Sequence, residues 1–520
     1  MPARRRHDSV VSETSTPELV KAGAAELAGM IASRRVSATE AVTAHIERIQ
    51  SLEGKLHAVV TPLFEQAIAE AAEADRGSAA GRPLHGVPVT VKECFHIEGT
   101  PSTLGLDAKR GATAADTADL VKRLNNAGAI VVAKTNVPQL LLYIESDNPL
   151  YGRTNNPWDL ARTPGGSSGG EGAAVAAGYG SIGLGTDIGG SVRIPAHFCG
   201  VHSLKPTPDR LSLRGTEDES FFSPYAIPDA AGPLARSVED LRLAMSALGS
   251  PIAERPVKDL RIGVYEDDGY IPASPAIKRA IRTAASALET MGCRVQEFAP
   301  PDTYEALAVF YGLFTVDGGD SPKAWTRGSA VDPRIKDLLT LAGLSGALRR
   351  PVSALYRFRG QRRIGQLVGW AGRRSEAAAG ELVARRDAFR RRFDEAMADL
   401  DVLICPPCSL PAFTHGATKD LGPASICYTL TFNLLAWPAG VVAATRVRGG
   451  EEVGRPANRD LVDETARRVD LGSAGLPVGV QVAARSGRDD QVLSVMAALE
   501  QHFRDQADYP VTSFRIDASR

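Results

Sequence analysis

Apolar residues recur at helical spacing in the N-terminal part of the chain. An apolar stripe from Leu19 to Ile31 follows Thr16-Pro17, which predicts a helix with Thr16 as its cap and the proline in its first turn. Ser37 and Glu40 have the spacing of a capping box, so a second helix is expected to run through Ile49. The chain is therefore expected to open with two helices.

A different periodicity begins near residue 85. Val87, Val89 and Val91 alternate with other residues over 85–93, which predicts a strand whose opposite face ends at Lys92. A helix is expected around 115–127 and a strand over 130–134. Because strands and helices alternate, the pattern predicts an α/β layered fold, with helices covering a large mixed, mostly parallel central sheet.

The domain organisation follows from the absence of any linker-like stretch. We expect a disordered tail at 1–13, one domain over 14–510 and a second tail at 511–520. Within the domain we expect a core region at 85–245, an inserted helical segment at 303–395 and the C-terminal part of the core at 396–510.

Composition narrows the class of protein. The 520 residues carry 60 Lys and Arg against 61 Asp and Glu, a net charge of −1, so no nucleic-acid partner is expected. Six cysteines are too sparse for a disulfide framework, and no apolar region follows the basic N-terminus. A cytoplasmic location is therefore predicted. His197 and His202 lack matching ligands, and neither a metal nor another cofactor is expected.

The longest uncharged stretch, residues 421–445, is long enough by count to span a bilayer. Pro423, Pro438, Gly440 and several polar side chains interrupt it. These breakers favour a buried helix followed by a buried strand.

Glycine is concentrated at the centre of the chain, where 12 of the 50 glycines lie between Gly165 and Gly200. Alanine, valine and isoleucine are interleaved with them, so the segment is predicted to be buried and not a flexible linker. Its backbone is free to approach another backbone or a ligand closely.

Several short segments match the consensus of a known functional motif but lack the structural context that the chemistry of the motif needs. Gly178 to Gly183 fits a dinucleotide fingerprint without a clear strand–turn–helix context, and no P-loop lysine follows the glycines. Gly165 to Gly169 fits a nucleophile elbow, for which His415 is the only plausible histidine downstream. Cys405 to Cys408 has redox spacing but leads into prolines.

Three motifs together resemble the amidase signature family. They are GVPVTVKE, which contains Lys92, GGSSGGEGA, which contains Ser167, and GTDIGGSVRIPA, which contains Ser191. The separations of 75 and 24 residues match those of the family. The resemblance covers nearly the whole chain and implies an amidase-signature α/β/α fold.

The resemblance also implies a Ser-Ser-Lys triad. Lys92 would act as the base through Ser167, and Ser191 would attack the amide carbonyl and form an acyl-enzyme. Lysine is ordinarily charged at neutral pH, but burial disfavours its ammonium form, and an apolar strand suits that requirement. The oxyanion would be bound by backbone N–H groups of Ile188, Gly189, Gly190 and Ser191. Supporting roles fall on Ser168, Thr186, Asp187 and Arg193, although the charged pair among them is equally compatible with a structural role.

The sequence around these three motifs resembles the fatty acid amide hydrolase branch of the family more than the glutamyl-tRNA amidotransferase branch. In the former branch the substrate would contact Leu141, and an acyl channel would include Leu142, Tyr143, Ile144, Leu430, Phe432 and Leu435. Each of these side chains could equally belong to the core. We expect a hydrolase of linear amides with an apolar acyl group, such as N-acylethanolamines. The alternatives are a broad amidase for small aliphatic or aryl amides and the amidase component of a glutamyl-tRNA transamidation complex.

Residues 331–375 combine ten Lys and Arg, two aspartates and many leucine and aromatic residues. A cationic amphipathic pair of helices is typical of a segment that lies on a membrane surface, although a basic face over the core would look the same. We expect a small-molecule amide substrate, peripheral membrane contact through 331–375 and a homodimer.

Overall fold

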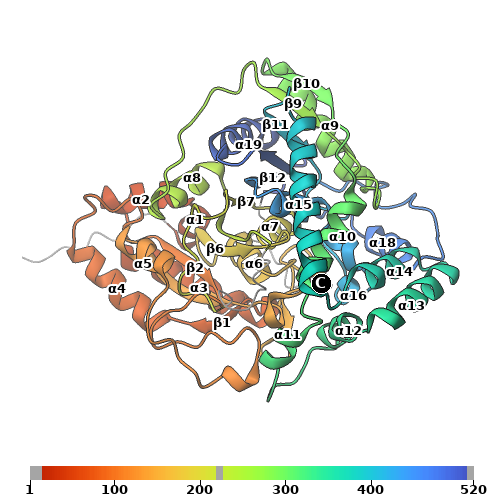
Figure 1. The fold of residues 1–520 in the computed structure, drawn as a ribbon. Helices are drawn as coiled ribbons and strands as arrows, with labels where there is room; N and C mark the ends of the chain where they lie inside the picture. The colour runs from red at the N-terminus through yellow and green to blue at the C-terminus, as the bar shows by residue number, and fades with distance from the viewer. Residues whose placement is uncertain (1–14, 218–226, 512–520) are drawn as a thin grey trace, which may run out of the picture.

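The structure is a computed structural model that describes residues 15–217 and 227–511 (Figure 1). The predicted tails therefore lie outside the described residues, except for Val511. The N-terminal helices are α1 (Thr16–Lys21), α2 (Ala24–Ala32), α3 (Ala38–Leu56) and α4 (Phe64–Arg76). The first predicted helix is two helices, and its cap is Ser15, whose amide N–H donates to Glu18 at 2.8 Å. The capping box at Ser37 begins α3 as predicted.

The core of the molecule is one sheet in the order β1-β3-β2-β6-β8-β7-β12-β13-β11-β9-β10. Most of its strands are buried along much of their length, whereas β1 and β10 at the two edges are more exposed. The strands are β1 (Val59–Pro62), β2 (Pro88–Lys92), β3 (Ile130–Thr135), β6 (Ile182–Asp187), β7 (His202–Lys205), β8 (Ala230–Ala235), β9 (Arg261–Val264), β10 (Arg294–Glu297), β11 (Val402–Cys405), β12 (Ala439–Arg446) and β13 (Pro477–Ala484). A separate hairpin pairs β4 (Asp147–Asn148) with β5 (Gly152–Arg153).

The α/β layered architecture and the mixed sheet are confirmed. Parallel pairing is confined to β3-β2-β6 and β11-β9-β10, which lie towards the two ends. The centre is antiparallel, because β8 lies between β6 and β7 and runs antiparallel to both, while β12 pairs antiparallel with β7 and β13. Fewer strand pairs are thus parallel than the strand–helix alternation indicated. The alternation along the chain does not reveal that a later strand, such as β8, is inserted between two earlier ones.

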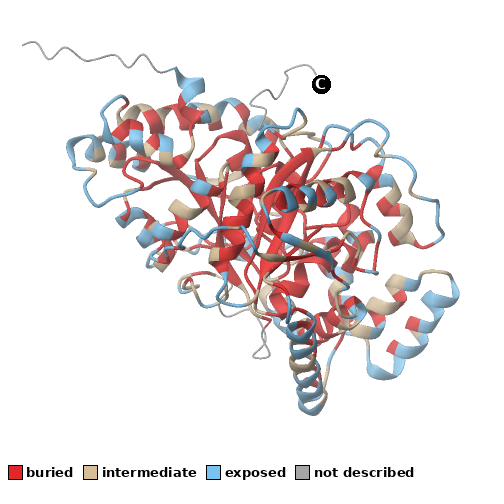
Figure 2. Cartoon of the chain, turned by 90° about the horizontal axis from the view of Figure 1, so that it is seen from above, coloured by how far each residue is buried: buried red, intermediate tan, exposed pale blue. Residues whose placement is uncertain are grey.

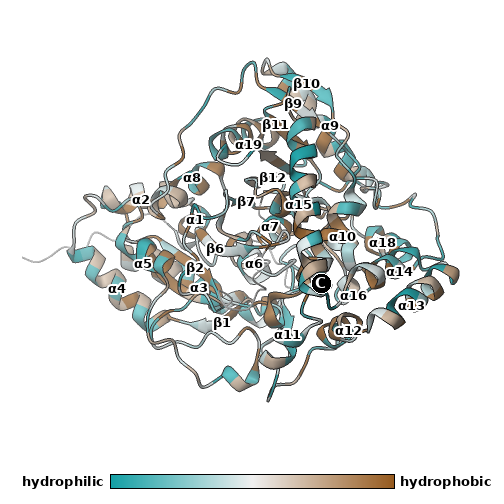
Figure 3. Cartoon of the chain, viewed as in Figure 1, coloured by the Kyte–Doolittle hydropathy of each residue, from teal (hydrophilic) through white to brown (hydrophobic). Residues whose placement is uncertain are grey.

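Helices cover the sheet, and buried residues concentrate in the sheet and in the helices against it (Figure 2). Between β10 and β11 the described chain is helical, with no strand. Both hydrophobic and hydrophilic residues occur on these helices (Figure 3). The helices after α4 are α5 (Asp119–Asn126), α6 (Gly169–Ala177), α7 (Arg193–Cys199), α8 (Val238–Ala247), α9 (Pro275–Thr290), α10 (Thr303–Phe314), α11 (Asp320–Trp325), α12 (Pro333–Ala342), α13 (Gly346–Phe358), α14 (Arg362–Trp370), α15 (Glu376–Ala396), α16 (Ala417–Leu421), α17 (Cys427–Leu434), α18 (Leu461–Asp470) and α19 (Asp489–Arg504), with 3₁₀ turns η1 (Asp107–Lys109), η2 (Gln139–Leu141) and η3 (Gly422–Ser425).

The uncharged stretch 421–445 forms the buried helix α17 and the buried strand β12, as predicted. None of the described helices is both long and apolar enough to cross a membrane.

Candidate active site

Lys92 is the last residue of β2 and its side chain is fully buried. Its Nζ donates a hydrogen bond to Ser167 Oγ at 2.8 Å and another to Thr186 Oγ1 at 2.6 Å. Thr186 lies on β6, which pairs with β2 in parallel, so neighbouring strands bring the amine and the hydroxyl together. Two hydroxyl groups thus hold a lysine amine at the end of a buried strand.

Ser167 lies in the loop before α6, after a cis Gly166–Ser167 peptide bond. An added Cβ at Gly166 would lie 2.6 Å from the carbonyl oxygen of Tyr143, so only glycine fits this close approach. The Ser168 amide N–H donates to the Ser191 carbonyl at 3.1 Å, and the Ser168 hydroxyl donates to the Thr186 carbonyl at 3.3 Å. The loop carrying Ser167 is therefore joined directly to the one carrying Ser191.

The Ser191 loop is built around Asp187 and Arg193, which are both fully buried. Arg193 Nε and Nη2 donate to the two Asp187 carboxylate oxygens at 3.0 and 2.8 Å. Burial alone would raise the pKa of Asp187, but the Arg193 charge and hydrogen bonds outweigh it and hold that pKa well below its usual range. Arg193 also donates to the side chains of Gln481 and Asn433, so the pair ties the loop to β13 and α17.

The backbone N–H groups of the loop differ in their availability. The Gly190 N–H donates to Asp187 Oδ1 at 2.8 Å and is therefore engaged within the protein. Within the described residues no acceptor engages the amide N–H of Ile188, Gly189 or Ser191. Three of the four predicted oxyanion donors are thus unengaged, and Gly190 instead fixes the turn at a φ of +123°.

A cavity of about 440 Å³ opens at Ser191. Ile188, Gly189 and Ser191 form part of its wall, together with all four neighbouring residues of the predicted substrate contacts, Leu141, Leu142, Tyr143 and Ile144. The Tyr143 hydroxyl donates to the Arg334 carbonyl, so this part of the wall is anchored to α12. The structure brings these predicted residues together around the Ser191 end of the cavity.

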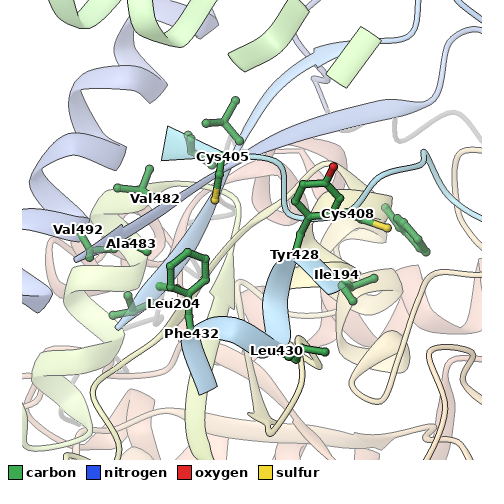
Figure 4. Packing of buried hydrophobic residues seen from close by; sticks show 14 of the residues in the cluster. Ile194, Leu204, Cys405, Cys408, Tyr428, Leu430, Phe432, Val482, Ala483 and Val492 are labelled. Atoms are coloured by element: carbon green, nitrogen blue, oxygen red, sulfur yellow. The ribbon is translucent and has the colours of Figure 1, made fainter. Parts of the chain in front are cut away.

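Leu430, Phe432 and Leu435 are a correction to the predicted channel. They are buried but do not line the cavity. Figure 4 shows Leu430 and Phe432 of α17 among core side chains that include Leu204 and Val482. Because α17 is buried on every side, its apolar residues pack mainly against the sheet and its neighbouring helices.

Most of the remaining cavity wall was not predicted as substrate-contacting. Much of it comes from α10, α12 and α14, whose apolar members are Phe310, Tyr311, Phe314, Leu338, Leu341, Ile364 and Leu367, and the rest includes residues of α13, α16, η3 and α18. The available signal was the run of apolar residues in α10 and the leucines of the basic segment 331–375. That signal indicates burial, but it does not identify which face contacts a cavity.

The residues of the alternative motifs have other surroundings. His415 Nε2 lies 3.1 Å from the Leu160 carbonyl, and His197 bridges the Leu410 carbonyl and the Gly479 N–H. No described hydrogen bond joins a histidine to Ser167 or Ser191. Cys405 and Cys408 are buried free thiols, and burial raises the pKa of each to about 12, which disfavours the reactive thiolate.

Comparison with known proteins agrees with this geometry. The Amidase family model matches residues 40–493. The chain is 35% identical over 446 residues to fatty-acid amide hydrolase 1 of Sus scrofa, a match that covers 80% of this chain and 76% of that protein. It is 32% identical over 485 residues to amidase 2 of Gibberella moniliformis, covering 90% of this chain and 88% of that protein.

Among solved structures, a fatty acid amide hydrolase superposes with a TM-score of 0.79 over 94% of this chain and 86% of that chain, at 24% identity. This likeness shows the shared fold. The family match over most of the sequence shows more: the chain belongs to the Amidase family, the amidase-signature enzymes that hydrolyse amide carbon–nitrogen bonds.

Proposed function

We propose that the protein hydrolyses linear amides with an apolar acyl group, using Ser191 as nucleophile and Lys92 as base through Ser167. The observation that carries this proposal is the 2.8 Å hydrogen bond from Lys92 to Ser167, beside a mainly apolar cavity that has Ser191 in its wall. No carboxylate is among the hydrogen-bond partners of this buried amine, and its contact with a serine hydroxyl suits a base that acts through that serine.

The proposed reaction proceeds in two stages. Neutral Lys92 accepts the Ser167 proton while Ser167 takes the proton of Ser191, and Ser191 Oγ attacks the amide carbonyl. The unengaged amides of Gly189 and Ser191 bind the developing oxyanion. The relay then returns a proton to the leaving amine as the carbon–nitrogen bond breaks. Water attacks the acyl-enzyme by the same route and releases the acid.

The lining of the cavity supports an apolar acyl group. Most of the residues that line the cavity are apolar, among them leucine, isoleucine and phenylalanine from η2, α10, α12 and α14. Burying a methylene against such a wall stabilises a complex by about 0.8 kcal/mol. The similarity to fatty-acid amide hydrolase 1 points the same way. The alternatives are an amidase for small amides, which the similarity to amidase 2 would also fit, and the amidase component of a transamidation complex.

An acyl-length series tests the proposal. Purified protein alone is expected to release amine from amides of two to eighteen carbons, with kcat/KM rising with chain length. A maximum at the shortest amides would favour the small-amide alternative, and activity only with added partner proteins would favour transamidation. Ser191→Ala is expected to abolish both turnover and fluorophosphonate labelling. Persistent labelling at Ser167 would contradict the assigned roles.

We also propose that the protein acts in the cytoplasm, as a homodimer, with peripheral membrane contact through 331–375. Support for the contact comes from α13, where Leu348, Leu355 and Phe358 are exposed. Size-exclusion chromatography with light scattering tests the dimer, and vesicle binding tests the contact.

A further inference from the structure

A second concave site lies away from the cavity, between α13 and α14. It is a groove of about 790 Å³, and four arginines line it: Arg349, Arg350, Arg357 and Arg374. None of the four forms an ion pair with a carboxylate in the described part of the chain. Other arginines nearby do, since Arg363 binds Asp463 at 2.7 Å. The groove therefore collects positive charge that the protein itself leaves without a counter-charge.

Arg349 is the buried member of this arginine groove. The residue is only 8% exposed, and its Nε has no hydrogen-bond partner among described residues. Its Nη2 donates only to carbonyl oxygens, of Leu344 at 3.2 Å and of Arg373 at 3.5 Å. A buried guanidinium without a carboxylate or full hydrogen bonding is costly, so an anion in the groove would relieve it.

The backbone around Arg349 is shaped to admit it. Gly372 has a φ of +116°, and an added Cβ there would lie 2.3 Å from Arg349 Nη2. Ser353, also in the groove wall, donates to the Gly365 carbonyl at 2.6 Å and joins α13 to α14. The arginine groove is thus held by close packing of two helices rather than by loose surface side chains.

Exposed apolar residues also lie on α13, outside the groove itself. Phe358 is 90% exposed, and Leu348 and Leu355 are exposed on the same helix seven residues apart. Aromatic and leucine side chains beside arginines are typical of a helix that lies at a membrane surface. A soluble phosphate would use the arginines but would leave these side chains in water.

We infer that the arginine groove binds the phosphate group of an acidic membrane lipid, while the exposed apolar residues of α13 enter the acyl region. This inference deepens the membrane contact proposed above by assigning it a lipid-headgroup site. The same helix pair contributes Tyr356, Ile364 and Leu367 to the cavity at Ser191. A bound lipid would therefore place the cavity wall next to the membrane that holds an apolar substrate.

The test compares two double variants of the full chain with equal loss of charge. Arg350→Gln with Arg357→Gln removes exposed groove arginines, whereas Arg359→Gln with Arg362→Gln removes exposed arginines of the same helix pair outside the groove. Sedimentation with phosphatidylcholine vesicles containing phosphatidylglycerol is expected to show at least about a tenfold loss of binding for the groove variant and less than about threefold for the control. Hydrolysis of a short soluble amide should be unchanged in both.

Each of the other possible results would overturn a particular part of the inference. Equal losses in the two variants would mean diffuse electrostatic attraction without a site. Equal binding of unmodified protein to vesicles with and without phosphatidylglycerol would retain membrane contact but remove the headgroup site, and no binding to either would remove both. Full displacement from vesicles by millimolar glycerol 1-phosphate at constant ionic strength would assign a soluble phosphate as the ligand. None of these results bears on amide hydrolysis, which is measured separately.

Discussion

The contact of Thr186 with Lys92 can be tested separately from the packing of the Thr186 side chain. Its hydroxyl accepts from Lys92 Nζ at 2.6 Å and is one of two groups that orient the amine. Thr186→Val keeps the shape but removes that acceptor, so kcat is expected to fall about tenfold or more, with little change in KM. Thr186→Ser keeps a hydroxyl and is expected to retain most activity. An equal fall in both variants, in steady-state assays of a short amide, would assign Thr186 a packing role only.

Gly189 and Gly190 are adjacent, yet alanine is expected to affect them differently. At Gly190 an added Cβ would lie 2.4 Å from Thr429 Oγ1 at a positive φ, so Gly190→Ala should lower the melting temperature. At Gly189 the nearest side chains to an added Cβ would be Phe310 and Ile426, at 3.5 and 3.6 Å, on the wall of the cavity.

Gly189→Ala is therefore expected to keep the melting temperature within a few degrees while activity falls about 10²-fold, because the methyl group crowds the oxyanion position. Thermal unfolding and amidase assays on both variants check this contrast. A Gly189→Ala protein that is as unstable as Gly190→Ala would show that both glycines serve only the turn.

At the scale of elements, the inserted helices α12 and α14 form one wall of the cavity. Leu341→Trp or Leu367→Trp adds volume on that wall, and overfilling a cavity of about 440 Å³ should exclude the longest acyl groups first. We expect kcat/KM for an eighteen-carbon amide to fall about tenfold and that for a two-carbon amide to change little.

Leu348→Trp is the matched control, because Leu348 is 56% exposed on α13 and does not line the cavity. It should leave both substrates unaffected in a soluble assay. If the control alters acyl-length preference as much as the wall variants do, the inserted helices do not act through the cavity volume.

The elements also show what a sequence can and cannot predict. The strand ending at Lys92 follows from local alternation, and the capping box at Ser37 follows from two side chains. The choice between Leu141 and Leu430 as cavity residues does not, because both are buried leucines and only tertiary packing decides which one meets empty space. Phe310 was missed for the same reason.

At the scale of the whole molecule, long-range contacts assemble the candidate site. Lys92, Ser167 and Ser191 are distant in sequence, and only the three motifs in register indicated that they belong together. The antiparallel insertion of β8 beside β6 was not predictable from strand–helix alternation. Likewise, Glu171 stood in a glycine motif, yet it is fully buried and accepts hydrogen bonds from Thr90 and Thr135 at 2.6 Å, joining α6 to two strands.

Buried histidines are expected to make the stability of the molecule depend on pH. Burial lowers the pKa of both His45 and His197 to about 4, from an ordinary value of 6.5. Between pH 6.5 and 4 the unfolded chain therefore binds more protons than the folded protein. The contribution of these histidines to the free energy of unfolding is fully present above pH 6.5 and is lost as the pH falls through this range. Each histidine contributes about 3 kcal/mol to that loss by pH 4.

His197→Gln tests this expectation, because an amide can donate to the Leu410 carbonyl and accept from the Gly479 N–H as the neutral imidazole does. The variant is expected to be somewhat less stable at pH 7, yet its urea midpoint should fall less steeply between pH 7 and 5, since one protonating group has been removed. His502→Gln, at a partly exposed position in α19, should retain the steeper dependence of the unmodified protein. Parallel slopes in all three proteins would show that acid sensitivity arises from other groups.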